Sequence, residues 1–240
     1  MLPIRDIIPR SSFPFVNYTL IALNVVIFLY EVSLPPHLLN ELFYLFGLVP
    51  ASFTNTEWKF FYGFYADNYW PFLTNIFLHG SWFHLISNMW TLFIFGDNVE
   101  DKLGHFKYLL FYLLSGLAAS FTHFIFNIDS TIPAVGASGA IAGIMGAYFI
   151  MFPHSRIVTL IPIFIIPFFI EIPAIIYLGF WFYTQIISGT FSLVANQNAS
   201  GIAWWAHIGG FLFGVVFHRI FIKKRYKDIY SDRIYQRFFN

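Results

Sequence analysis

The chain has 240 residues, of which 58% are hydrophobic and only 10% carry a charge. A soluble domain of this length has roughly a quarter charged residues. Too few polar side chains are present to coat a surface that faces water, so the sequence indicates an integral membrane protein. The net charge of +1 gives no reason to expect a nucleic-acid partner. The absence of cysteine excludes disulfides, thiolate metal sites and a cysteine nucleophile.

Six stretches are predicted to be membrane-spanning helices, since a span needs about 20 mostly apolar residues. In chain order they are residues 16–33, 81–96, 106–126, 138–152, 171–188 and 204–222. The fourth is short and rich in small residues, so we expect it to begin inside the membrane plane. The stretch 157–170 is also apolar, but Pro162 and Pro167 interrupt it. A proline inside a helix removes a backbone hydrogen bond, so we expect an interfacial or re-entrant connection there.

The basic residues predict how the chain is oriented. With six helices, twelve of the 13 Lys and Arg residues fall on one side and only Lys59 on the other. Basic residues gather on the cytoplasmic side of membrane proteins. We therefore expect a cytoplasmic N-terminal segment (1–15), a membrane domain (16–222) and a basic cytoplasmic tail (223–240), in a bacterial-type inner membrane. The aromatic-rich connection 35–80 then lies on the outer side, either half-sunk in the interface or as an ordered loop.

Polar side chains inside membrane helices are costly, so each requires an explanation. Such residues gather near the beginnings of the second, fourth and sixth helices: His79, His84, Asn88, Ser138 and His207. These three helices all begin at the outer side, so the five residues share one depth. Random placement would scatter them over both leaflets. This convergence predicts a functional site in the outer half of the membrane.

Small residues supply a means to bring the fourth and sixth helices together, because they let membrane helices approach closely. Gly139 directly follows Ser138, and Gly210 and Gly214 lie on the same face of the sixth helix as His207. Close packing of these two faces would bring the Ser138 hydroxyl within reach of the His207 imidazole.

Serine and histidine in contact have a well-defined chemistry. A serine hydroxyl is a weak nucleophile until a positioned base removes its proton, and histidine suits that role because its pKa lies near neutrality. The oxyanion formed on attack needs fixed donors, which the Ser138 N–H at a helix start and the side chains of His84 and Asn88 could supply. No Asp or Glu lies in the outer half of these helices, so a dyad is the economical hypothesis. Asp129, in the loop before Ser138, is a candidate for orienting the base.

Taken singly, these residues have ordinary structural explanations. A lone histidine in a membrane helix is often a packing residue, which is our expectation for His123 and His218, and a lone asparagine often joins helices. His79 either lines the site or sits at the membrane interface. Glu171, near the start of the fifth helix, is expected to extend its carboxylate to the interface. Joint occurrence at one depth is what favours a site.

The motifs together resemble those of the rhomboid family of intramembrane serine proteases. Gly136-Ala137-Ser138-Gly139 resembles its GxSG motif, Ala206-His207 through Gly214 resembles its AHxxGxxxG motif, and His79 through Asn88 resembles its HxxxxHxxxN pattern. The resemblance spans roughly residues 16–222. It implies an all-α membrane protein with a bundle of six transmembrane helices and a long outer first loop.

The resemblance also implies an activity. Rhomboids hydrolyse peptide bonds in or near transmembrane segments of other proteins, without metal or cofactor. By this likeness Ser138 is the nucleophile, His207 the general base and acid, and His84, Asn88 and the Ser138 amide the oxyanion donors. The fifth helix and the loop before His207 would gate lateral access of substrate. The residues expected to line or pack the site are His79, Gly136, Gly139, Gly210 and Gly214, with Trp204 and Trp205 near its rim.

The sequence departs from the family pattern at two places. Some relatives have a tyrosine one turn after the serine, packed on the histidine, whereas this chain has Ala142. Others have Trp-Arg in the first loop, whereas this chain has Trp70-Pro71. Neither change removes a chemical group that the dyad requires.

Two other classes of function stay open. One is a rhomboid-like protein that binds membrane clients without cutting them. The other is a small transporter, which predicts carboxylates or helix breaks near the midplane and two similar halves, none of which is evident. A zinc peptidase is disfavoured, because His79 and His84 are five residues apart and lack the H-E-x-x-H pattern. The sequence makes no prediction of the substrate's identity or of the oligomeric state.

Overall fold

The computed structural model describes residues 2–61, 68–163, 166–194 and 202–223. This part of the chain is mostly helical, with one small sheet. The helices are α1 (Phe15–Ser33), α2 (Pro36–Phe46), α3 (Ala51–Thr54), α4 (Thr56–Phe61), α5 (Pro71–Thr74), the 3-10 helix η1 (Asn75–Phe77), α6 (Trp82–Leu103), α7 (His105–Phe126), α8 (Ser138–Met151), α9 (Ala174–Val194) and α10 (Trp204–Phe221). The strands are β1 (Leu2–Asp6), β2 (Arg156–Ile163) and β3 (Ile166–Pro173).

Helices occupy all six stretches that were expected to span the membrane. Among the described residues, three helical segments are long and apolar enough to cross a membrane: Phe15–Ser33, His105–Phe126 and Ala174–Leu193. The helix Ser138–Met151 is apolar but shorter. The count of six spans therefore stays a prediction.

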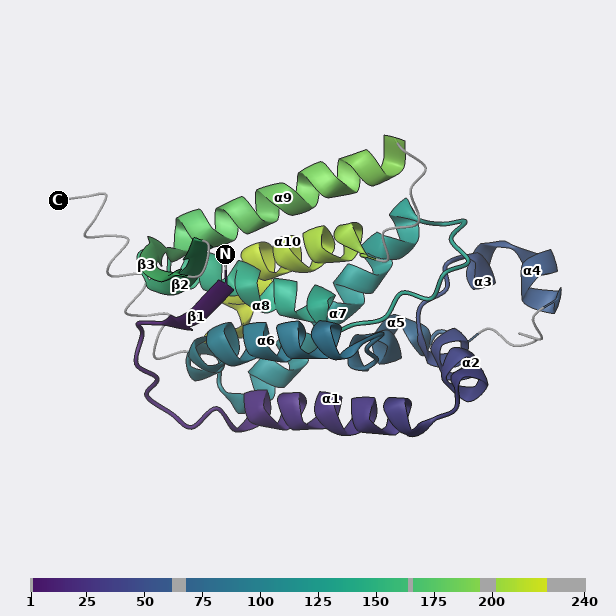
Figure 1. The fold of residues 1–240 in the computed structure, drawn as a ribbon, viewed down its shortest axis with the longest axis horizontal. Coiled ribbons are helices and arrows are strands. Elements are labelled where there is room, and N and C mark those ends of the chain that lie inside the picture. Colours follow the sequence, from purple (N-terminus) through teal and green to yellow (C-terminus); the bar gives the residue numbers. More distant parts are fainter. Residues whose placement is uncertain (1, 62–67, 164–165, 195–201, 224–240) are drawn as a thin grey trace.

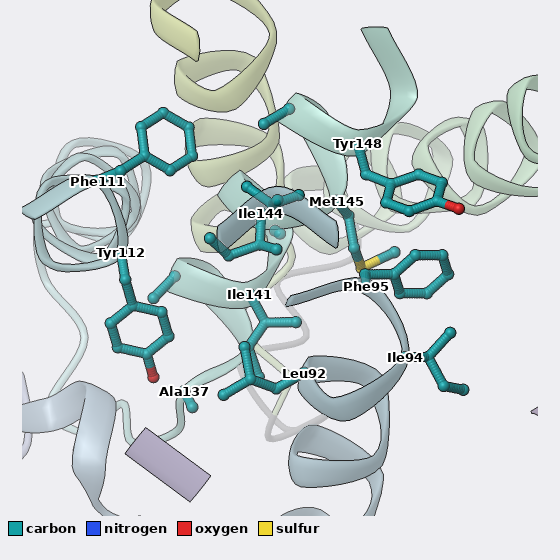
Figure 2. Packing of buried hydrophobic residues seen from close by; sticks show 14 of the residues in the cluster. Leu92, Ile94, Phe95, Phe111, Tyr112, Ala137, Ile141, Ile144, Met145 and Tyr148 are labelled. Atoms are coloured by element: carbon teal, nitrogen blue, oxygen red, sulfur yellow. The ribbon is translucent and has the colours of Figure 1, made fainter. Parts of the chain in front are cut away.

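Helix α8 lies in the middle of the molecule. Every residue from Gly139 to Tyr148 is buried, and the helix packs against α6, α7, α9 and α10. A helix that is apolar on every face is suited to such a position. In Figure 2, Ile141, Ile144 and Met145 of α8 lie among side chains from α6 and α7, including Leu92, Phe95, Phe111 and Tyr112.

The two ends of the molecule, between which the long helices run, differ in structure. In Figure 1, α1, α6, α9 and α10 extend in roughly the same direction while α7 crosses obliquely, with the sheet at one end and α2 to α5 at the other. The connection 35–80 is thus largely helical, in short pieces. Its residues 62–67, and the tail from residue 224 onward, lie outside the described residues.

The segment 157–170 differs from its expected form. The sequence predicts an interfacial or re-entrant connection, without regular secondary structure being assigned to it. In the structure β2 and β3 pair antiparallel, and β1 pairs with β2 as the third strand. Pro162 pairs with Pro167 one pair before the end of the ladder, where a missing N–H disrupts few strand hydrogen bonds. Residues 171–173 belong to β3, so the fifth long helix begins at Ala174 rather than at residue 171 and continues to Val194.

Glu171 is also placed differently from its expected position in a helix. It lies in β3, where its carboxylate forms an exposed ion pair with Arg156 on the neighbouring strand, at an N–O distance of 3.4 Å.

Buried polar side chains hold the N-terminal segment against α6 at the sheet end. The Glu100 carboxylate accepts the N–H groups of Val16 and Asn17 at the start of α1, at 3.0 and 2.7 Å. Asp6 of β1 accepts hydrogen bonds from the Tyr148 hydroxyl of α8, at 2.5 Å, and from the Asn98 amide of α6, at 2.7 Å. The N-terminal segment is therefore joined to the helices and is not a free extension.

Candidate active site

Ser138 is the first residue of α8, and the loop before it is shaped by glycine. Gly136 has a φ of +131°, a conformation that residues with a side chain rarely adopt. Its N–H donates to the Asn75 carbonyl at 2.9 Å, which fixes the loop against η1. Because Ser138 opens the helix, its own N–H belongs to the first-turn amides that have no acceptor within the helix.

His207 lies in the first turn of α10, with Nε2 at 2.8 Å from the Ser138 hydroxyl oxygen. Direct contact between the α8 and α10 backbones brings the two side chains together. A Cβ atom at Gly210 would lie 2.0 Å from the Gly139 carbonyl oxygen, and one at Gly214 would lie 2.0 Å from that of Gly143. Glycine is therefore required at both positions for the helices to approach this closely. Ser138 and His207 are both partly exposed, so a reactant can reach them.

The other ring nitrogen of His207 bonds to a residue that the sequence analysis missed. Nδ1 lies 2.8 Å from the Oε1 atom of Gln185 on α9. The Gln185 amide nitrogen donates to the Trp181 carbonyl at 3.0 Å and to the Thr184 hydroxyl at 3.1 Å, so its oxygen faces the imidazole. These bonds assign the proton of the neutral ring to Nδ1 and leave the Nε2 lone pair facing the Ser138 hydroxyl. Gln185, and not Asp129, is the partner of Nδ1.

His84 and Asn88 lie beside the loop that leads to Ser138. The Ser81 hydroxyl caps α6 by accepting the His84 N–H at 3.2 Å, which sets the first turn of that helix. A Cβ at Gly136 would lie 2.6 Å from the His84 ring and 3.7 Å from the Asn88 amide nitrogen. Within the described part of the chain, the buried Asn88 amide nitrogen has no hydrogen-bond partner. An unpaired buried donor is costly unless a ligand or water satisfies it.

His79 lies inside the protein, beside His84. Its N–H donates to the buried Glu31 carboxylate of α1, at 3.2 Å. Its ring centroid is 5.1 Å from that of His84 and 6.4 Å from that of Phe28. Among the described residues, neither of its ring nitrogens has a hydrogen-bond partner. The structure thus puts His79 in a protein interior and not at a bare interface.

Two tryptophan rings lie near His207, and a third packs on α7. The centroid of the Trp181 ring, from α9, lies 5.8 Å from that of His207, and the Trp204 ring lies edge-on to His207 at 6.2 Å. Trp205 stacks on Phe126 of α7, with centroids 3.6 Å apart. Of the two histidines expected to serve packing, His123 bonds to Asn127, just after α7, and His218 bonds to the Val215 carbonyl of its own helix.

Comparisons with known proteins point to one family for this chain. A family model described as the Rhomboid domain matches residues 66–224, which is more than half of the chain. The human presenilin-associated rhomboid-like protein, mitochondrial, is 28% identical over 153 residues, covering 60% of this chain and 36% of the relative. In Arabidopsis thaliana, RHOMBOID-like protein 1 is 29% identical over 164 residues, covering 68% and 37%. RHOMBOID-like protein 6, mitochondrial, from the same plant is 40% identical over 78 residues, covering 32% and 25%.

The chain thus aligns with between a quarter and little more than a third of the length of these relatives. Several are named as mitochondrial and one as chloroplastic, so their names give no support to the bacterial-type inner membrane expected from the sequence. The matched region includes α6 to α10, and with them Ser138, His207 and the glycine contact that joins them. By this match the chain belongs to the rhomboid family.

Proposed function

We propose that the chain is an intramembrane serine endopeptidase, which cleaves peptide bonds in or near transmembrane segments of other membrane proteins. The observation that carries the proposal is the 2.8 Å contact between the Ser138 hydroxyl and His207 Nε2. The side-chain oxygen of Gln185 accepts a hydrogen bond from the other ring nitrogen, Nδ1, and so orients the ring as a general base requires. In this proposal α1, α6, α7, α8, α9 and α10 each cross the bilayer, and both termini are cytoplasmic by the distribution of basic residues.

The chemistry follows from the placement of these atoms. His207 Nε2 takes the hydroxyl proton as the Ser138 oxygen bonds to the carbonyl carbon of the scissile peptide. The carbonyl oxygen becomes an oxyanion, which the Ser138 N–H and the side chains of His84 and Asn88 stabilise. The protonated imidazole gives its proton to the leaving nitrogen as the C–N bond breaks. Water, deprotonated by the same histidine, then hydrolyses the acyl-enzyme and restores the serine.

The unpaired Asn88 donor supports this assignment of the oxyanion donors. A buried amide that has no partner among the described residues beside the serine loop is the group an oxyanion would satisfy. A transporter would use the same histidines without needing a Ser–His bond. A rhomboid-like protein that holds membrane clients without cutting them is the remaining alternative, and it predicts that loss of the hydroxyl leaves function intact.

The test compares the wild-type protein with Ser138→Ala and His207→Ala in lipid vesicles that contain a substrate with one transmembrane segment. We expect both variants to lose cleavage while remaining folded in the membrane. Thr190→Ala is the matched control, because Thr190 is exposed on α9 and its hydroxyl bonds to the Ile186 carbonyl of its own helix. A fluorophosphonate should attach to Ser138 in the wild type alone, as read by mass spectrometry. Cleavage by Ser138→Ala at the wild-type rate would refute the proposal.

A further inference from the structure

We infer that Gln185 is a positioning residue for the base, so that the dyad is competent only while α9 is packed against α10. The inference rests on the proposed function, and it adds a residue and a helix to the part of the protein that controls the reaction. Gln185 touches neither the serine nor the position a substrate would occupy. It acts through His207, by accepting the hydrogen of Nδ1.

The contacts of the Gln185 side chain direct its oxygen toward His207. The residue is 4% exposed, in a helix that is otherwise rich in apolar side chains. Its amide hydrogens are directed to the Trp181 carbonyl and the Thr184 hydroxyl, so the amide cannot flip without losing both bonds. Burying an amide in a membrane helix is costly unless its groups are bonded. The bond to His207 satisfies the oxygen.

A neutral acceptor is suited to this position. An amide oxygen fixes which nitrogen bears the proton and where the ring points, without adding a charge to the site. A carboxylate would do the same and would also stabilise the protonated ring. The identity of the side chain at Gln185 therefore decides how readily His207 holds its proton.

Helix α9 also supplies an aromatic ring that lies close to His207. Trp181 lies one turn before Gln185, with its ring centroid 5.8 Å from that of the imidazole. The position one turn after the serine, where some relatives have a tyrosine packed on the histidine, is Ala142 here. Two of the side chains that hold the base are thus delivered by α9 and not by the central helices. A displacement of α9 away from α10 would release both at once.

The contact between α9 and α10 runs through a glycine. A Cβ at Gly189, one turn after Gln185, would lie 3.3 Å from Ile208 and 3.4 Å from Trp205. A methyl group therefore nearly fits, whereas a larger side chain would wedge the helices apart. On the opposite face, Ile186, Ile187 and Phe191 are exposed, so α9 is held on one side only. A displacement of α9 therefore breaks fewer contacts than a displacement of α8, which is surrounded by other helices.

The experiment uses the full chain in lipid vesicles and measures kcat, KM, the pH profile of kcat/KM and the rate of fluorophosphonate labelling. For Gln185→Leu, which keeps the volume and removes the acceptor, we expect kcat and the labelling rate to fall about tenfold with KM unchanged. For Gln185→Glu, which restores the acceptor, we expect kcat to recover. The acid limb of the kcat/KM profile of Gln185→Glu should move to higher pH by about one unit, because a carboxylate favours the protonated imidazole. Gly189→Leu should reproduce the loss with Gln185 intact, and Thr190→Ala should resemble the wild type.

The possible outcomes separate this inference from the function beneath it. Wild-type kcat and labelling in Gln185→Leu, beside an inactive Ser138→Ala, would overturn the role of Gln185 and leave the protease standing. Equal losses in Gln185→Leu and Gln185→Glu, with no movement of the pH profile, would also overturn it, because a merely structural role predicts that result. The Gln185→Glu profile decides alone if the leucine variant fails to fold. Cleavage by Ser138→Ala would remove both proposals.

Discussion

A methyl group at Gly210 tests whether the contact between α8 and α10 sets the distance between Ser138 and His207. A Cβ there would lie 2.0 Å from the Gly139 carbonyl oxygen, whereas ordinary contact begins at 3.4 Å. The oxygen belongs to the backbone and cannot rotate away, so the two helices must separate locally by about 1.4 Å. The same separation added to the 2.8 Å between the serine oxygen and Nε2 would break that hydrogen bond.

We therefore expect Gly210→Ala to lower kcat by about 100-fold, the usual effect of misplacing reacting groups by 1 Å. Overpacking should also lower the free energy of unfolding by about 1–3 kcal/mol. The assay is the initial rate of cleavage in vesicles together with the rate of fluorophosphonate labelling. Gly179→Ala in α9 is the matched control: its Cβ would lie 3.7 Å from the nearest atom, in Phe149, so we expect rates within about twofold of wild type. A Gly210→Ala protein with wild-type kcat and labelling would refute the reasoning from close packing.

Two further predictions concern the sheet end of the molecule. Burial raises the pKa of Asp6 to about 6, with a smaller contribution from the nearby Asp97. The folded state thus holds this proton more tightly than the unfolded chain. The stability that this one group contributes is therefore greatest below about pH 4, falls as pH rises to about 6, and is level above that. Asp6→Asn, which keeps an acceptor for Tyr148, should remove this decline and gain about 1–2 kcal/mol at neutral pH, after discount for partial exposure. Melting temperatures of both proteins across this pH range measure it, and parallel curves would contradict it. Glu100→Ala should lower stability by about 1–2 kcal/mol by removing the carboxylate that caps α1, with Glu100→Gln in between. An unchanged melting temperature in Glu100→Ala would show that the cap contributes nothing.

The parts of the fold that the sequence predicted well are those set by local pattern. Helices α1, α7, α8 and α10 begin and end within a residue of the expected bounds, because long apolar runs and their polar ends are local features. The approach of α8 and α10 was also expected, since glycine at Gly210 and Gly214 has no helical advantage and is explained best by a close neighbour.

The hairpin was missed for a physical reason. Two apolar runs of eight residues are long enough for strands and too short to be told from a membrane element by periodicity. What decides the structure is pairing, and β2 pairs with residues 2–6, which are about 150 positions away in the chain. The polar appearance of Arg5 and Asp6 concealed that strand, because the burial of Asp6 depends on Tyr148 and Asn98 from two distant helices.

Gln185 was missed although the signal for it was present. Membrane depth drew attention to polar residues where helices begin at the outer side, but α9 runs the other way and reaches that side at its end. Gln185 is an amide in an apolar helix, at the depth of His207, and the same cost of burial applies to it as to Asn88. Its depth in the membrane is by itself a reason to include Gln185 among the candidate site residues. Its role needed the rotation of α9 about its axis, because only one face of that helix meets His207, and the packing of Gly189 against α10 sets that rotation.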